Sequence, residues 1–218
     1  MRHLQSIRID WTHRSNWINW VIGMVMVLLF TMPLVDTHAD DSATRLVERT
    51  AEDMLRTLEA KRKEIDAKPQ LIYQLVGTKL APHFDFEMIT RSAVGRGWNQ
   101  ATPAQQQQLV AAFREVLVRT YAKSLLKYSG QDIVYQSAKP GTRDGTVIVP
   151  TEVRAPGAPP IPIDYRMHKL SGRWKVYDVV IDSVSLISNY RGQFRTVIGR
   201  DGIDGLIAEL KSKNASGA

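Results

Sequence analysis

The sequence predicts an α+β domain, built as one curved antiparallel sheet of about four strands with helices covering one face. Between residues 42 and 128 apolar side chains recur at helical spacing, whereas between 132 and 182 they alternate with polar ones, as in strands. Turn-forming stretches separate the alternating segments, so neighbouring strands should pair antiparallel. Helical spacing returns near the C-terminus. This order indicates α+β rather than alternating βαβ units, and no internal repeat divides the chain.

The first 39 residues have the features of a secretory signal peptide. Three arginines precede an uncharged apolar run at 19–35, and small residues follow at Thr37 and Ala39. We therefore predict cleavage after Ala39, which leaves a domain of residues 40–218. The alternative is an uncleaved anchor, because an apolar run of about 17–20 residues just spans a bilayer.

The composition excludes several kinds of site. The chain contains no cysteine, which rules out disulfides, zinc–thiolate sites and a cysteine nucleophile. Removal of residues 1–39 takes away three basic and two acidic side chains of 29 and 22, which leaves a net charge of about +6. An exported basic protein is expected to meet anionic membrane surfaces or acidic proteins rather than nucleic acid. The charge is also compatible with a merely solubilising role.

Local signals place the helices of the N-terminal half. Apolar spacing predicts a first helix over 42–65, which should end before Pro69, and a second helix over 69–80. Asp85 is placed to cap a short helix that ends at Val94, and the stretch GRGWNQ reads as a loop.

The next helix has the clearest start signal. Thr102 is the expected N-cap, Pro103 the first helical residue, and Gln105 completes a capping box. The helix should run to about Tyr128. Its wide apolar face contains Leu109, Phe113, Val116, Leu117, Thr120, Tyr121, Leu125 and Tyr128.

The expected strands cover 132–138, 146–155, 160–170 and 173–182. Pro150 argues for an edge or a bulge in the second of them. Strict alternation in the fourth puts Trp174 and Val176 on one face and Tyr177 and Val179 on the other. Two short C-terminal helices, joined at 199–202, are expected to cover the part of the sheet that the long helix leaves open.

Few residues point to catalysis. We find no complete phosphate-binding glycine motif, no GxSxG and no HExxH, and therefore predict neither metal nor cofactor. Asp178 and Asp182 share a strand face at roughly 13 Å, too far apart for a glycosidase pair. Either carboxylate alone could be the general base of an enzyme acting on a small apolar substrate. That reading is the alternative to a carrier.

The surplus of apolar surface without a catalyst favours a carrier of an apolar ligand. Each buried methylene is worth about 0.8 kcal/mol, so a sixteen-carbon chain is worth on the order of 12 kcal/mol. A soluble carrier must offer nearly that much dry surface to draw a lipid from a bilayer. A cavity between sheet and helices would provide it better than a surface groove.

Several motifs together resemble the MlaC family, also called toluene-tolerance or ABC-transporter auxiliary proteins. They are FDFEMITRSAVGRGWNQATPAQQQQLVAAFREVLVRTYAKSLLKY, VIVPTEV, PIPIDYRMHKLSGRWKVYDVVIDSVSLISNYRGQF and GIDGLIAELKSKN. The resemblance covers about residues 45–213. One departure is Asp182–Ser183, where the family usually has Glu-Gly or Asp-Gly.

The resemblance implies a nuclear-transport-factor-like cone with extra helices and a periplasmic, non-enzymatic function. Such a protein shuttles phospholipids between an outer-membrane lipoprotein–porin complex and an inner-membrane ABC transporter with an MCE-domain subunit, which maintains outer-membrane lipid asymmetry. The acyl chains would lie between sheet and helices. The residues expected to line their site are Phe113, Leu117, Tyr121, Leu125, Val147, Val149, Val153, Ile163, Tyr165, Met167, Trp174, Val176, Val184, Ile187, Tyr190 and Phe194.

Overall fold

The computed structural model describes residues 38–216. The predicted signal peptide lies outside the described residues up to Thr37, and the predicted cleavage site after Ala39 falls in the first turn of the first described helix. The division of the chain at residue 39 therefore stays a prediction. Within 38–216, no helix is both long and apolar enough to cross a bilayer.

The helices confirm most of the expected elements. They are α2 (His38–Ala60), α3 (Arg62–Ala67), α4 (Leu71–Lys79), α5 (Phe86–Val94), α6 (Pro103–Leu125) and α7 (Leu186–Ala215), with 3-10 helices η1 (Ala81–His83) and η2 (Gly95–Gln100). The capping box of Thr102 and Gln105 is present at the start of α6. Asp85 caps α5 by accepting a hydrogen bond from the backbone N–H of Met88.

Three helix predictions need correction. The single helix expected over 42–65 is interrupted at Lys61, where the backbone leaves helical geometry (φ −103°, ψ 12°). This bend lets Ile65 of α3 join the core beside α2 and α4. The expected loop GRGWNQ is a 3-10 helix whose Trp98 is buried, and α6 ends at Leu125 rather than near Tyr128.

The sheet is antiparallel and has six strands among the described residues. They are β1 (Asp132–Tyr135), β2 (Lys139–Pro140), β3 (Thr146–Arg154), β4 (Ile161–Leu170), β5 (Arg173–Ile181) and β6 (Val184–Ser185). The order is β1-β3-β4-β5-β6, and β2 also pairs with β3. The count exceeds the expected four because β2 and β6 are two-residue strands, too short to show alternation.

Pro150 lies in the internal strand β3 rather than at an edge strand, at a gap between its partners on one side. On that side β1 pairs with residues 151–154 and β2 with 147–148, which leaves Pro150 between them. The backbone N–H of Gln136 donates to the Pro150 carbonyl on the same side. The missing N–H of the proline therefore costs the sheet no ladder bond.

A β-bulge in β5 corrects the predicted alternation of that strand. Arg166 pairs with Asp178 and Met167 pairs with Val176, so Tyr177 is an extra residue. Val176 and Val179 consequently both pack in the core under the helices, although strict alternation separates them.

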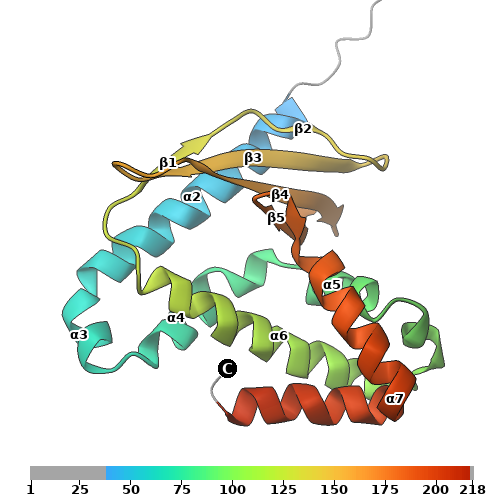
Figure 1. Cartoon of the computed structure of the whole chain (residues 1–218). Coiled ribbons are helices and arrows are strands. Elements are labelled where there is room, and N and C mark those ends of the chain that lie inside the picture. The colour runs from blue at the N-terminus through green and yellow to red at the C-terminus, as the bar shows by residue number, and fades with distance from the viewer. Residues whose placement is uncertain (1–37, 217–218) are drawn as a thin grey trace, which may run out of the picture. The chain divides into compact units, whose positions relative to one another are not determined.

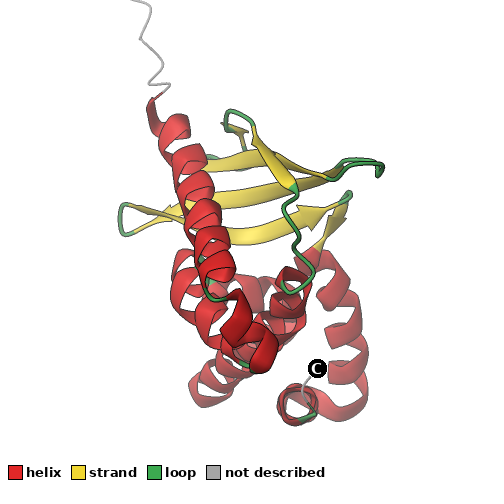
Figure 2. Cartoon of the chain, turned by 90° about the vertical axis from the view of Figure 1, so that its left-hand side faces the viewer, coloured by secondary structure: helices red, strands yellow, loops and turns green. Residues whose placement is uncertain are grey.

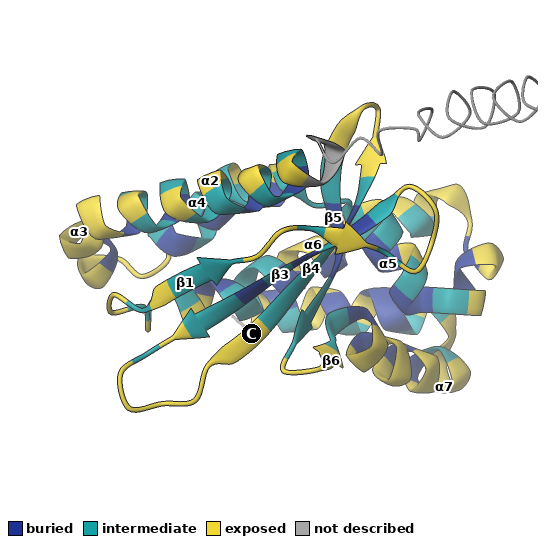
Figure 3. Cartoon of the chain, turned by 90° about the horizontal axis from the view of Figure 1, so that it is seen from above, coloured by how far each residue is buried: buried dark blue, intermediate teal, exposed yellow. Residues whose placement is uncertain are grey.

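The helices cover one face of the sheet. Figure 1 shows the sheet above α4, α5, α6 and α7, and Figure 2 shows α2 lying across it. Ala43 and Val47 of α2 pack on Val147, Val149, Met167 and Val176 of the sheet. The buried residues lie on the inner sides of the helices, with exposed residues outside (Figure 3).

The C-terminal helix α7 consists of two segments, as expected. It bends at Gly202, where the backbone has a positive φ of 71°. Glycine adopts this conformation at little cost. In the first segment, Tyr190 and Phe194 pack edge-to-face on Phe113 of α6, with ring centroids 4.8 and 4.9 Å apart. This packing fixes α7 against α6 at the side of the sheet.

Candidate functional site

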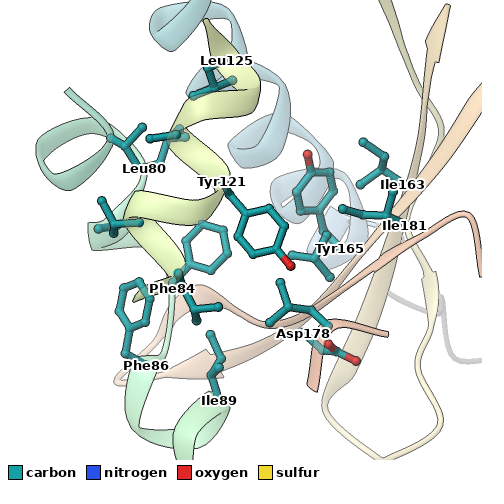
Figure 4. A pocket seen from close by; sticks show the side chains of 17 residues that line it. Leu80, Phe84, Phe86, Ile89, Tyr121, Leu125, Ile163, Tyr165, Asp178 and Ile181 are labelled. Atoms are coloured by element: carbon teal, nitrogen blue, oxygen red, sulfur yellow. The ribbon is translucent and has the colours of Figure 1, made fainter. Parts of the chain in front are cut away.

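A cavity of about 270 Å³ lies between the sheet and the helices (Figure 4). Its walls come from α4, η1, α5, α6, β4, β5 and the first residue of α7. The lining residues are Val76, Leu80, Ala81, Phe84, Phe86, Ile89, Leu117, Val118, Tyr121, Ala122, Leu125, Ile163, Tyr165, Asp178, Val179, Ile181 and Leu186.

The cavity wall is almost wholly apolar. Only Tyr121, Tyr165 and Asp178 bring polar side-chain atoms to it, and none of its lining residues is Lys, Arg or His. Burial raises the pKa of Tyr121 to about 12 and also raises the pKa of Tyr165, so both phenols are neutral near pH 7. Such a surface suits an apolar ligand, and it disfavours a free ion because the ion would lose its hydration without gaining a partner.

The carboxylate of Asp178 accepts three hydrogen bonds from other residues of the protein. Its Oδ2 accepts hydrogen bonds from Arg166 Nη1 (3.1 Å) and Ser185 Oγ (2.8 Å), and its Oδ1 accepts one from the Ile187 N–H (3.2 Å). The side chain is 3% exposed, and Figure 4 shows its carboxylate turned away from the aromatic rings of the cavity. Asp178 therefore ties β4 and β5 to the start of α7.

The second candidate base, Asp182, lies apart from the cavity. It is exposed in the turn between β5 and β6, where its backbone is left-handed (φ 48°). Residues 38–216 also contain no group of three or more His, Asp or Glu side chains placed to hold a metal ion. Of the two carboxylates that the enzyme alternative proposed, Asp178 lies at the cavity and Asp182 does not.

The segment before α5 closes one side of the cavity. The Asp85 N–H donates to the Val176 carbonyl (2.9 Å), His168 Nε2 lies 2.9 Å from Asp85 Oδ2, and Lys175 Nζ donates to the Pro82 carbonyl. These contacts hold the segment on the free edge of β5. On either side of Asp85, Phe84 and Phe86 turn stacked rings toward the cavity (Figure 4).

Five of the sixteen residues expected to bind lipid line this cavity. They are Leu117, Tyr121, Leu125, Ile163 and Tyr165. They come from the apolar face of α6 and the inner face of β4, which the periodicity identified.

The other eleven lie elsewhere. Val147, Val149, Met167, Trp174 and Val176 pack under α2, and Phe113, Ile187, Tyr190 and Phe194 pack between the helices. Val153 is half-buried on β3. Val184 does not complete the wall as expected, because it is 60% exposed on the edge strand β6, and Leu186 takes that place. Contact of these eleven residues with a lipid stays a prediction.

Sequence reasoning missed most of the wall formed by α4, η1 and α5. The apolar face of the helix expected over 69–80 already contained Val76 and Leu80. Phe84 and Phe86 had no comparable signal, because they flank a helix break without periodicity.

Comparison with known proteins agrees with this architecture. The family model described as "MlaC protein" matches residues 48–212. The chain belongs to the MlaC family. Toluene tolerance protein ttg2D of Pseudomonas putida is 28% identical over 201 residues, covering 88% of this chain and 92% of that protein. The intermembrane phospholipid transport system binding protein MlaC of Haemophilus influenzae is 25% identical over 195 residues, covering 88% and 91%.

A solved structure that this chain resembles is that of the phospholipid-binding protein from Ralstonia solanacearum in complex with a phospholipid. The TM-score is 0.72 at 37% identity, with 82% of this chain and 98% of that chain covered. This MlaC family member thus shares its α+β fold with a protein that was solved with phospholipid bound.

Proposed function

We propose that this chain is a periplasmic phospholipid carrier that holds acyl chains in the cavity between sheet and helices. The observation that carries the proposal is a wall of seventeen residues without one basic side chain, in which the single carboxylate is bonded to other parts of the protein. The phospholipid complex of the Ralstonia solanacearum protein supports it.

In this proposal the signal peptide 1–39 exports the chain and is cleaved after Ala39. The carrier then exchanges phospholipid between an inner-membrane ABC transporter with an MCE-domain subunit and an outer-membrane lipoprotein–porin complex, which maintains lipid asymmetry. The name of the Haemophilus influenzae relative, an intermembrane transport binding protein, supports this cycle. No catalytic step is needed for it.

The cavity must widen to take a complete phospholipid. At about 270 Å³ it is slightly smaller than the roughly 300–1,000 Å³ of typical small-ligand pockets. Separation of the segment 81–86 from β5 would enlarge it, because that segment is held by a few polar contacts at a strand edge.

Native mass spectrometry of protein from a periplasmic extract, followed by lipid extraction, tests the proposal. We expect the mass of residues 40–218 plus one or two phospholipids. A bare mass that stays bare after incubation with liposomes would overturn the carrier function, and a mass that includes residues 1–39 would overturn cleavage alone.

A further inference from the structure

Tyr165 is a partly buried polar residue in the wall of the cavity. It lies on β4, on the sheet side of the cavity, across from Tyr121 of α6 (Figure 4). Its hydroxyl forms no hydrogen bond to any of residues 38–216, and burial is the sole cause of its raised pKa. Tyr121, by contrast, has its hydroxyl near that of Tyr190.

An unpartnered hydroxyl in the interior is unfavourable, because it has lost its hydrogen bonds to water without replacement. Such groups in native proteins usually face a ligand or an ordered water. Tyr165 lines the cavity, so a group held in the cavity is placed to complete its hydrogen bond.

The chemistry of the wall selects which part of a phospholipid this is. A phosphate is charged, and no Lys, Arg or His lines the cavity to neutralise it. Methylene groups accept no hydrogen bond. The acyl ester carbonyls are the neutral acceptors nearest the apolar chains of a glycerophospholipid, whereas headgroup hydroxyls lie beyond the phosphate.

We propose that the Tyr165 hydroxyl donates a hydrogen bond to an acyl ester carbonyl of the bound lipid, and so selects ester-linked over ether-linked glycerolipids. This assignment rests on the proposed carrier function. It places the glycerol esters between β4 and α6 and keeps the phosphate outside the apolar wall.

The test compares dipalmitoyl phosphatidylglycerol with its dihexadecyl ether analogue, which has the same headgroup and the same chain length. Delipidated protein is equilibrated with mixed liposomes of the two lipids, and the bound ratio is read by mass spectrometry. We expect the wild type to prefer the diester about two- to ten-fold, the net value of one hydrogen bond. Tyr165→Phe should lose this preference by binding less diester.

Tyr177→Phe is the matched control, since it removes the same atom from the neighbouring strand β5 at a residue that does not line the cavity. It should keep the diester preference. A wild type without preference, or a Tyr165→Phe variant that retains it, overturns the assignment while leaving lipid carriage intact. If neither lipid binds to any variant, the carrier function itself fails.

A second measurement needs no variant. The infrared carbonyl band of ¹³C-ester-labelled lipid bound to the wild type should lie at lower wavenumber than in a dry apolar solvent, because hydrogen bonding weakens the C=O bond. An unshifted band overturns the proposal even if Tyr165→Phe does not fold. A band shift that persists in Tyr165→Phe also overturns the proposal, because the carbonyl then accepts its hydrogen bond from water or from another donor.

Discussion

Ser183 is held in a backbone conformation that suits glycine. With Asp182 (φ 48°) and Ser183 (φ 66°), the two-residue turn between β5 and β6 has both central residues left-handed. Asp-Gly is a preferred pair for such hairpin turns, and a serine there is strained.

Ser183→Gly should therefore raise the free energy of unfolding by about 0.5–1 kcal/mol. Urea unfolding followed by circular dichroism measures it. Ser188→Gly is the control, because it places glycine in the first turn of α7 and should destabilise the fold. A Ser183→Gly variant less stable than the wild type would show that the serine side chain contributes more than its backbone costs.

Two partly buried tyrosines make the fold sensitive to alkali. Burial raises the pKa of Tyr121 and of Tyr135 to about 12, whereas in the unfolded chain phenols lose their protons near pH 10. Between these values the folded protein binds more protons than the unfolded chain, so its stability falls as pH rises.

We expect the free energy of unfolding to decline from about pH 10 upward, and to decline less steeply in a Tyr121→Phe/Tyr135→Phe variant. Denaturant unfolding between pH 8 and 11.5 measures both slopes. Equal slopes in the two proteins would mean that other groups govern the alkaline transition.

At the scale of elements, the segment between α4 and α5 is the part of the cavity wall attached at a strand edge. Phe84 forms a single bridge with Val176, in addition to the contacts of Asp85 described above. Because the chain has no native cysteine, a disulfide between these two positions can be formed without competing thiols.

The Phe84→Cys/Val176→Cys variant should load phospholipid when reduced and load much less when oxidised, since the disulfide holds the cavity closed. Lipid uptake from liposomes, before and after addition of a reductant, measures this. Each single-cysteine variant is the control and should not respond to reductant. Equal uptake by both forms would show that the lipid enters elsewhere.

Elements with strong local sequence signals were predictable, whereas elements whose geometry depends on contacts with neighbouring elements were not. Thr102, Pro103 and Gln105 fixed the start of α6 because capping chemistry acts within one turn. The extra residue Tyr177 in β5 has no such local signal. The sequence of β5 alone does not show where an extra residue interrupts the alternation, because that depends on the pairing with β4. The strand faces beyond the bulge were therefore assigned wrongly.

At the scale of the whole molecule, periodicity identified the apolar faces that pack in the core but not the place where a cavity remains between them. Phe113 and Tyr121 belong to the same apolar face of α6. Phe113 packs against Tyr190 and Phe194, whereas Tyr121 borders the cavity. The difference depends on the bend of α7 and on the position of α5, neither of which follows from the sequence of α6 alone.

Lipid carriage also has a test at this scale. Ile163 lines the cavity, whereas Ile161, two residues earlier on the same face of β4, is 48% exposed. Ile163→Glu puts a charge into the apolar wall and should abolish lipid co-purification, while Ile161→Glu should retain it.

Extracted lipid per mole of protein measures the difference, with circular dichroism to establish that both variants fold. Equal loss in both variants would indicate that lipid adheres to the apolar outer surface rather than entering the cavity.

The position of α2 has a consequence for the order of events during export. The helix begins at His38, and Ala43, only four residues after the proposed cleavage point, is completely buried against the sheet. A peptidase needs an extended, accessible backbone at the bond that it cuts. Cleavage at the proposed site would therefore have to precede the docking of α2, and the proposed carrier would close its core and begin to load lipid only after maturation.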